Sequence, residues 1–180
     1  SEMGYMYIVR PGFVPESNEA IVSLFGNDLL SSTRGQLEAK GAGIKLKRGD
    51  LALRTNFATI DSVQNGNIID RRAGRTLTTK EAEILAKEIN KIPLSCKFLF
   101  QPTIQHRGVL VLRGGFSDNI SSNDINLYEE GKVKEHNKTI LCKPLDEEDN
   151  SQYTANIINE FLIKSHEVLD NHPINQSRKK

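Results

Sequence analysis

Residues 51–60 carry the pattern that most constrains the fold, because apolar and polar side chains alternate along them. An alternation of period two places every second side chain on the same face of a strand. Arg54 and Asn56 lie on the polar face. The opposite face carries Leu51, Leu53, Thr55, Phe57 and Thr59. The pattern predicts a half-buried β-strand with polar groups along one side.

Turn and capping signals predict the neighbouring elements. Asn65-Gly66 favours a type I′ hairpin turn, so we expect residues 67–70 to return beside 51–60. Thr78 and Glu81 form a capping box ahead of a helix of about 14 residues. We also expect strands over 5–9, 97–100 and 109–113, and helices over 17–25, 31–40 and 151–170. Because no regular βαβ rhythm connects these elements, the fold class is α+β.

Composition excludes several broad functions. The 24 Lys and Arg residues nearly balance the 23 Asp and Glu residues, so no global field recruits nucleic acid or an anionic membrane. No apolar run approaches the roughly 20 residues that span a bilayer. The first residues lack the features of a secretory signal, and we therefore expect a cytoplasmic protein. Cys96 and Cys142 lack zinc-site spacing and are expected to be reduced, structural thiols.

A cluster of guanidinium groups is the main candidate for chemistry. Arg71, Arg72 and Arg75 follow the predicted returning strand, and Arg54 lies on the strand before it. Planar, always-charged guanidinium groups bind phosphate and carboxylate bidentately. The candidate binding residues are Arg54, Asn56, Asp70, Arg71, Arg72 and Arg75, with Asp70 able to orient an arginine. The alternative is a solvated loop of surface charges with one salt bridge, which the residues alone favour equally.

Two further positions carry possible catalytic groups. His106 and Arg107 stand at the start of the strand at 109–113, where a proton donor and a guanidinium group could face one cleft. The alternative is a structural histidine, which is the more common role of a lone histidine. Ser17 is a nucleophile only if a metal or a base activates it, and otherwise it is the N-cap of the helix at 17–25.

A resemblance to a known family adds what these patterns leave open. The run Gly49–Asp61, followed by Asp-Arg-Arg-Ala-Gly-Arg at 70–75, resembles a signature of archaeal-type cofactor-independent phosphoglycerate mutases. His106-Arg107, Asn159-Glu160-Phe161 and the segment from His172 to Arg178 are also similar to that family. The resemblance covers nearly the whole chain. It implies a glycolytic isomerase of the alkaline phosphatase superfamily, which moves phosphate between the 3- and 2-hydroxyls of glycerate through a phosphoserine.

The resemblance also implies a domain organisation. Residues 1–33 are part of a phosphatase-like α/β domain that carries the nucleophile Ser17. Residues 34–150 are an inserted, mixed substrate-binding domain, and 151–180 are a helix returning towards the phosphatase-like domain. The implied substrate-binding residues are Arg54, Asn56, Asp70, Arg71, Arg72, Arg75, His106 and Arg107. The implied partner is phosphoglycerate, with no nucleic acid and no membrane, and the oligomeric state stays open.

The resemblance implies a divalent metal, Mn, Co, Mg or Zn, in an intact parent protein. Ser17 is its only ligand within these residues, so we expect this chain to be a fragment that binds no metal and is inactive alone. Around the nucleophile, Glu16, Asn18, Glu19 and Ile21 depart from the family pattern, and Asn126 stands where it has a histidine. Two alternatives follow: an inactive paralogue that binds a phosphorylated metabolite, or another phosphotransferase or phosphatase of the superfamily.

Overall fold

The computed structural model describes residues 34–123, 126–129, 132–135 and 137–178. The chain divides into two compact units. One unit contains residues 34–125 and 136–180, and the other includes strands β6 and β7. Ser17 and the elements predicted over 5–9 and 17–25 lie outside the described residues.

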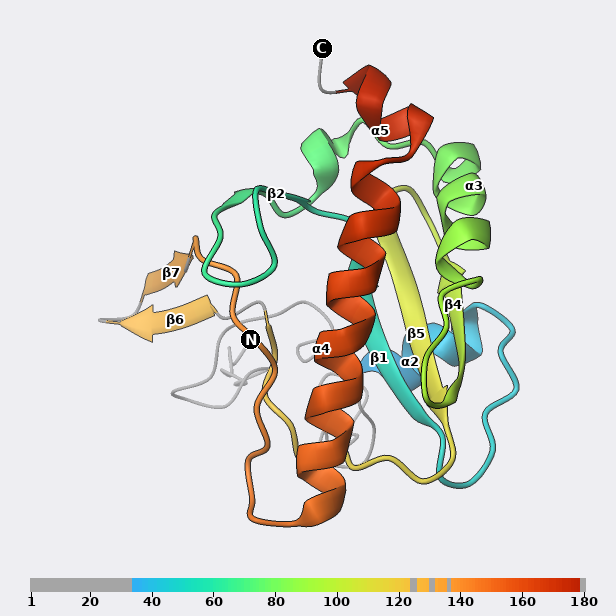
Figure 1. The fold of residues 1–180 in the computed structure, drawn as a ribbon, viewed down its shortest axis with the longest axis vertical. Helices are drawn as coiled ribbons and strands as arrows, with labels where there is room; N and C mark the ends of the chain where they lie inside the picture. Colours follow the sequence, from blue (N-terminus) through green and yellow to red (C-terminus); the bar gives the residue numbers. More distant parts are fainter. Residues whose placement is uncertain (1–33, 124–125, 130–131, 136, 179–180) are drawn as a thin grey trace, which may run out of the picture. The chain divides into compact units, whose positions relative to one another are not determined.

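A three-stranded antiparallel sheet forms the centre of the larger unit, in the order β1-β5-β4 (Figure 1). Its strands are β1 (Leu51–Asn56), β4 (Lys97–Pro102) and β5 (Arg107–Arg113). In the central strand β5, Val109, Leu110, Val111 and Leu112 are all buried, because both of its faces are covered. β4 is an edge strand, so Pro102 at its end costs no ladder hydrogen bond. The strands predicted over 97–100 and 109–113 are confirmed, and both are longer than predicted, since β4 continues to Pro102 and β5 begins at Arg107.

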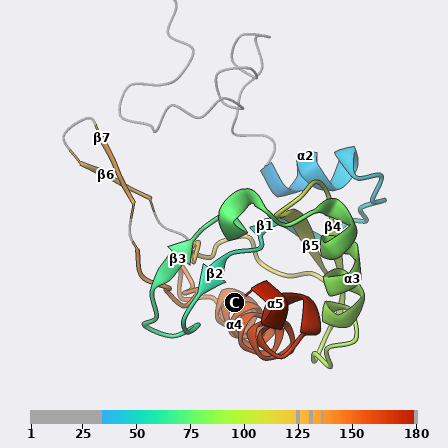
Figure 2. The ribbon, with the colours of Figure 1, turned by 90° about the horizontal axis from the view of Figure 1, so that it is seen from above.

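Helices cover both faces of this sheet (Figure 2). On one face, α2 (Arg34–Gly41) contributes Ala39 to a small core that contains Ala52, Val109 and Val111. On the other face, α3 (Thr79–Ile89) and α4 (Asp149–Asp170) form the larger core. That core includes Leu85, Ile89, Phe100, Leu110, Leu112, Ile158 and Phe161. The mixture of helices with antiparallel strands confirms the α+β class.

The predicted strand over 51–60 is broken at Phe57-Ala58. β1 pairs with β5, and only the short β2 (Thr59–Ile60) pairs with β3 (Ile68–Asp70). The predicted type I′ turn is wrong, because Asn65 has a φ of 56° whereas Gly66 is not among the described glycines with positive φ. Gly66 is instead buried against the backbone of Ser62, where any side chain would clash. The buried Phe57 packs edge-on against Phe100, which directs the chain out of the sheet after β1.

The capping box that begins α3 is confirmed. The hydroxyl of Thr78 accepts a hydrogen bond from the Glu81 amide at 3.2 Å, and the Glu81 carboxylate accepts one from the Thr78 amide at 2.8 Å. α3 has 11 residues and buries Ala82, Leu85, Ala86 and Ile89, which form the predicted apolar stripe. α4 runs for 22 residues, and after Asn171 a short helix α5 (Pro173–Arg178) follows.

The remaining elements are small. The one-turn element η2 (Ala73–Arg75) lies between β3 and α3. In the other compact unit, β6 (Asn126–Glu129) and β7 (Lys132–Glu135) form an antiparallel pair. Among the described helices, none combines the length and the apolar character needed to cross a membrane.

Candidate functional site

The end of β1 and the beginning of β5 place three candidate residues on one face of the sheet. Asn56 lies directly opposite Arg107, and Arg54 lies opposite Val109. Directly opposed residues of an antiparallel pair share a face, and Val109 packs against α2. Arg54, Asn56 and Arg107 therefore lie on the α2 side. Arg107 and Asn56 are exposed there, whereas Arg54 is half-buried.

α2 supplies a carboxylate to this face. Oε1 of Glu38 lies 2.7 Å from Nε of Arg54 and 3.6 Å from Nε of Arg34. The side chains of Arg54 and Glu38 are only 26% and 23% exposed, so this ion pair is more shielded than an ordinary surface pair. Sequence analysis did not identify Glu38, because only the packing of α2 on β1 brings it to Arg54.

The turn after β3 carries Arg72 and Arg75. Oδ1 of Asp70 accepts a hydrogen bond of 2.6 Å from the Arg72 amide. This bond is the largest cause of the lowered pKa of Asp70, followed by a bond from the Gly74 backbone and the charges of Arg72 and Arg75. Asp70 therefore orients the backbone of this turn, so its carboxylate organises the arginines indirectly.

His106 is buried where these segments meet. Its carbonyl oxygen accepts a hydrogen bond of 2.6 Å from the Phe57 amide, which ties it to the end of β1. Within the described part of the chain, its Nδ1 atom is buried and has no hydrogen-bond partner. Desolvation is the first cause that lowers the pKa of His106. The charges of Arg107, Arg72, Arg75 and Arg54 lower it further, in that order.

Four of the predicted arginines, Arg54, Arg72, Arg75 and Arg107, thus lie near enough to His106 for their charges to lower its pKa. Arg71 is oriented differently, since its Nη1 atom donates to Oδ1 of Asn137 at 3.1 Å. Arg71 thus contacts Asn137, whose carbonyl also accepts a hydrogen bond of 3.0 Å from the Ile68 amide of β3. Asn56 lies on the same face of the sheet as Arg107, because the two residues are directly opposite each other in the β1–β5 pairing.

An open pocket of about 540 Å³ lies beside this cluster. Helix α2 contributes Glu38 and Gly41 to its lining, and α3 contributes Glu83. The end of β4 and the following turn supply Gln101, Pro102, Thr103 and Ile104, and β5 supplies Arg107. Glu38 and Arg107 thus belong both to the pocket and to the charged face of the sheet. The pocket offers room for a small polar molecule next to Arg107, and Glu38 and Glu83 also line it.

Within the described ranges, no group of three or more His, Cys, Asp or Glu side chains is arranged to hold an ion. Ser17, the single predicted ligand, lies outside those ranges. The described residues therefore do not fit a metal, and no metal-dependent step is assigned to them.

Comparison with known proteins identifies the family. The sequence profile described as 2,3-bisphosphoglycerate-independent phosphoglycerate mutase matches residues 1–175. An enzyme of that name from Aeropyrum pernix is 43% identical over 98% of this chain and 45% of its own length. Its counterpart from Archaeoglobus fulgidus, 2,3-bisphosphoglycerate-independent phosphoglycerate mutase 1, is 40% identical over 97% of this chain and 42% of its own length.

A solved structure agrees with these matches. The cofactor-independent phosphoglycerate mutase from Thermoplasma acidophilum superposes with a TM-score of 0.68 at 31% identity. The match covers 91% of this chain and 42% of that structure. The chain belongs to the 2,3-bisphosphoglycerate-independent phosphoglycerate mutase family, as its motifs predicted. It spans less than half the length of these relatives.

Proposed function

We propose that these residues are the substrate-handling part of a phosphoglycerate mutase that interconverts 3- and 2-phosphoglycerate. In the full-length protein, Ser17 accepts the phosphoryl group, and residues beyond those described would hold the divalent metal ions that the family's chemistry implies. Residues 34–150 are the inserted domain on flanking pieces of an alkaline-phosphatase-like domain. The 180 residues alone do not catalyse the reaction.

This proposal rests on the positions of four predicted arginines: Arg54 and Arg107 lie on one face of the sheet, and Arg72 and Arg75 lie in the turn after β3. The charges of all four lower the pKa of the buried His106. Phosphoglycerate carries a phosphate and a carboxylate, and both match the planar fork of a guanidinium group. A neutral imidazole adds no charge to this region but can still exchange a hydrogen bond with a substrate hydroxyl. The adjoining open pocket suits a molecule of this size.

The reaction explains why a separate binding surface is needed. In the first half, the phosphoryl group leaves the 3-oxygen of the substrate for Oγ of Ser17. Glycerate must stay bound and turn, so that its 2-oxygen takes the phosphoryl group back. If glycerate escaped, water would hydrolyse the phosphoserine and the protein would be a phosphatase. Arginines that hold the glycerate carboxylate would prevent that loss.

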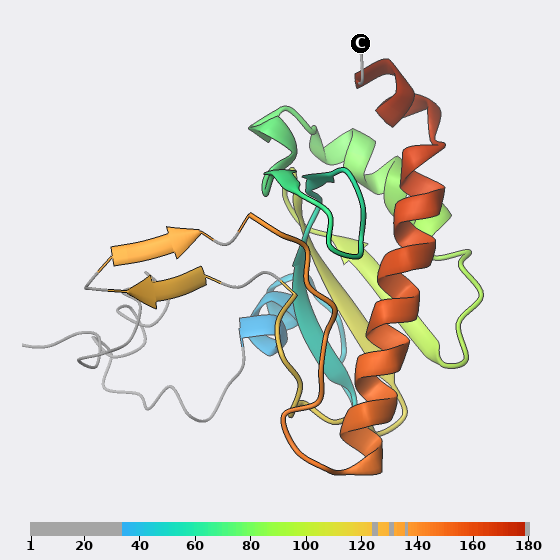
Figure 3. The same cartoon turned by 60° about the vertical axis from the view of Figure 1, so that its left-hand side comes forward.

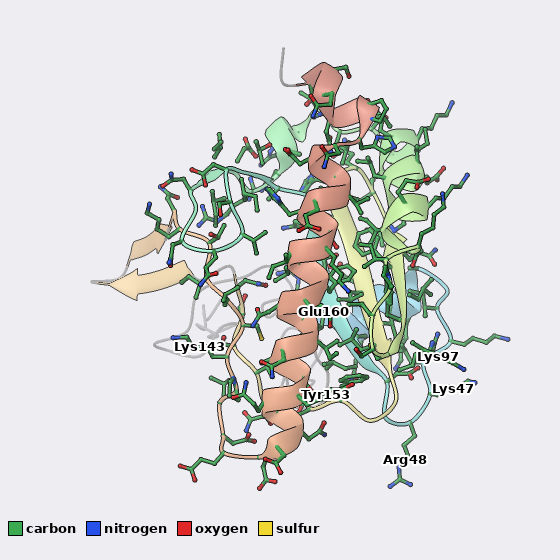
Figure 4. The ribbon with its side chains drawn as sticks, in the orientation of Figure 1. Lys47, Arg48, Lys97, Lys143, Tyr153 and Glu160 are labelled. Carbon is green, nitrogen blue, oxygen red and sulfur yellow. The ribbon has the colours of Figure 1, made fainter. Side chains whose placement is uncertain are left out.

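Replacing arginine by lysine at the turn tests the proposal. In the full-length protein, we expect Arg72→Lys and Arg75→Lys each to lower kcat/KM for 3-phosphoglycerate by about tenfold or more, because a point charge replaces a fork. The matched control is Arg48→Lys, since Arg48 extends away from the α2–β1 loop at the far end of the unit from α5 (Figure 4). Unchanged turnover in both turn variants would remove the arginines from the site.

The same assay separates the alternative functions. Isomerisation with labelled phosphate on Ser17 supports a mutase. Release of inorganic phosphate without isomerisation would indicate a phosphatase, and binding of phosphoglycerate without any transfer would indicate an inactive paralogue.

A further inference from the structure

The guanidinium group of Arg178, at the end of α5, contacts the turn that carries Arg72 and Arg75. Its Nη2 atom donates to the Ala73 carbonyl at 3.1 Å and to the Thr76 hydroxyl at 2.5 Å. Its Nη1 atom donates to the Thr76 carbonyl at 3.4 Å. η2 and α5 lie at the same end of the unit in both side views (Figures 1 and 3). One side chain thus binds three acceptors of a turn more than 100 residues earlier in the sequence.

This turn has a backbone that needs such support. Ala73, Gly74 and Arg75 have φ values of 47°, 65° and 55°, so three successive residues are left-handed. Glycine adopts this conformation freely, but alanine and arginine do not. A turn of this kind persists only where its surroundings hold it. Asp70 binds its amide groups on one side, and Arg178 binds its carbonyl groups on the other.

Arg178 is itself held in place. Ile174 packs against the larger core, and the Asn175 side-chain amide donates to the Leu169 carbonyl at 2.8 Å, so α5 is fixed to the end of α4. Nη1 of Arg178 also lies 3.9 Å from the Glu81 carboxylate, which the capping box of α3 holds. Contacts with α3 and the attachment of α5 to α4 therefore hold the guanidinium group in place independently of the turn.

We propose that Arg178 is a positioning residue for the phosphoglycerate site, which holds the turn at residues 73–76 so that Arg72 and Arg75 stay near His106. That the ligand is phosphoglycerate rests on the proposed function, whereas the positioning role of Arg178 does not. Arg178 acts through the turn, because its Nη1 and Nη2 atoms make three hydrogen bonds to it. Lysine cannot replace it, since one ammonium group does not reproduce the planar fork.

Two measurements on Arg178→Ala and Arg178→Lys variants of the full-length protein test the proposal. The first is the pKa of His106, followed by NMR of the labelled imidazole, with a His106→Gln variant for assignment. We expect this pKa to rise towards its ordinary value of 6.5 as Arg72 and Arg75 move away. The second is the dissociation constant for 3-phosphoglycerate, which we expect to increase about tenfold.

Matched variants guard against loss of folding. Thr76→Val keeps Arg178 but removes the hydroxyl group that accepts one of its hydrogen bonds. We therefore expect the His106 pKa and the dissociation constant to change in the same direction as in the Arg178 variants, by a smaller amount. Arg48→Ala removes an exposed arginine elsewhere in the unit and is expected to change neither.

The outcomes separate the two proposals. A higher His106 pKa together with weaker 3-phosphoglycerate binding supports the positioning role at a phosphoglycerate site. A higher pKa with unchanged affinity keeps the positioning role and overturns the assignment of the arginines to phosphoglycerate. An unchanged pKa in folded Arg178 and Thr76 variants overturns the positioning role, whatever the affinity does.

Discussion

Nε of Arg54 on β1 lies 2.7 Å from Oε1 of Glu38 on α2. This pair connects the helix to the sheet at the edge of the proposed binding face. Because both side chains are about three-quarters buried, solvent and salt screen the pair only in part. Glu38 thereby fixes the Arg54 side chain on the face of the sheet that also carries Arg107.

We expect Glu38→Gln to lower the free energy of unfolding by about 1 kcal/mol, since Arg54 loses its ionic partner in a shielded position. Urea unfolding measures this change, and a double-mutant cycle with Arg54→Gln isolates the coupling between the two side chains. The control is Glu88→Gln, because the Glu88–Lys91 pair is exposed and should contribute nothing measurable. Equal losses in the two variants would contradict a special role for the Glu38–Arg54 pair.

Gly35 allows α2 to approach the sheet closely. A Cβ atom at this position would lie 2.6 Å from the Ala52 carbonyl carbon and 3.0 Å from Cα of Leu53, and it would clash with the Ala52 oxygen. We expect Gly35→Ala to destabilise the protein by about 3 kcal/mol, because helix and strand must separate. Gly41→Ala, in the same helix with open space around it, should be neutral or stabilising. Thermal unfolding of both variants distinguishes close packing from helix propensity.

The buried His106 makes stability depend on pH in a defined window. Its pKa in the folded protein is below the ordinary value of 6.5, so the unfolded chain binds a proton first as pH falls. The free energy of unfolding should therefore decrease below about pH 6.5 until the pH reaches the folded pKa. His106→Gln should remove this decrease. Urea midpoints measured between pH 7.5 and pH 5 test the effect, and an unchanged slope in the variant would contradict it.

A second titration provides an internal control for that experiment. Hydrogen bonds within the turn and the capping box lower the pKa values of Asp70 and Glu81. Carboxylates of this kind stabilise the fold at higher pH and lose that contribution below about pH 4. The wild type and the His106→Gln variant should lose stability alike in that range.

Asn159 on α4 binds the backbone of a neighbouring loop through both ends of its amide. Its Oδ1 atom accepts from the Cys142 amide at 2.8 Å, and its Nδ2 atom donates to the Cys142 carbonyl at 2.9 Å. Asn159→Asp cannot donate the second bond, and we expect a loss of about 2 kcal/mol by urea unfolding. Asn156→Asp, at an exposed position of the same helix, should cost much less. Similar losses would mean that the new charge, rather than the lost bond, is responsible.

Local signals predicted some elements well because their causes lie within a few residues. Thr78 and Glu81 satisfy each other's backbone groups whatever the rest of the chain does, so the start of α3 was predictable. Asn65-Gly66 was misleading for the opposite reason. The type I′ preference acts on an isolated hairpin, whereas packing of Phe57 on Phe100 breaks the strand and leaves a longer loop.

Local sequence patterns were enough to predict the α+β class, the polar residues at the end of β1 and the arginines that can bind an anion. Folding brings together groups that are far apart in the sequence, because pairings between distant segments place Arg72, Arg75 and Arg107 near enough to His106 for their charges to lower its pKa. It alone also placed Glu38 against Arg54 and Arg178 against the turn. The physical reason is that side-chain identity fixes what a group can bind, whereas strand register and helix packing fix where that group lies.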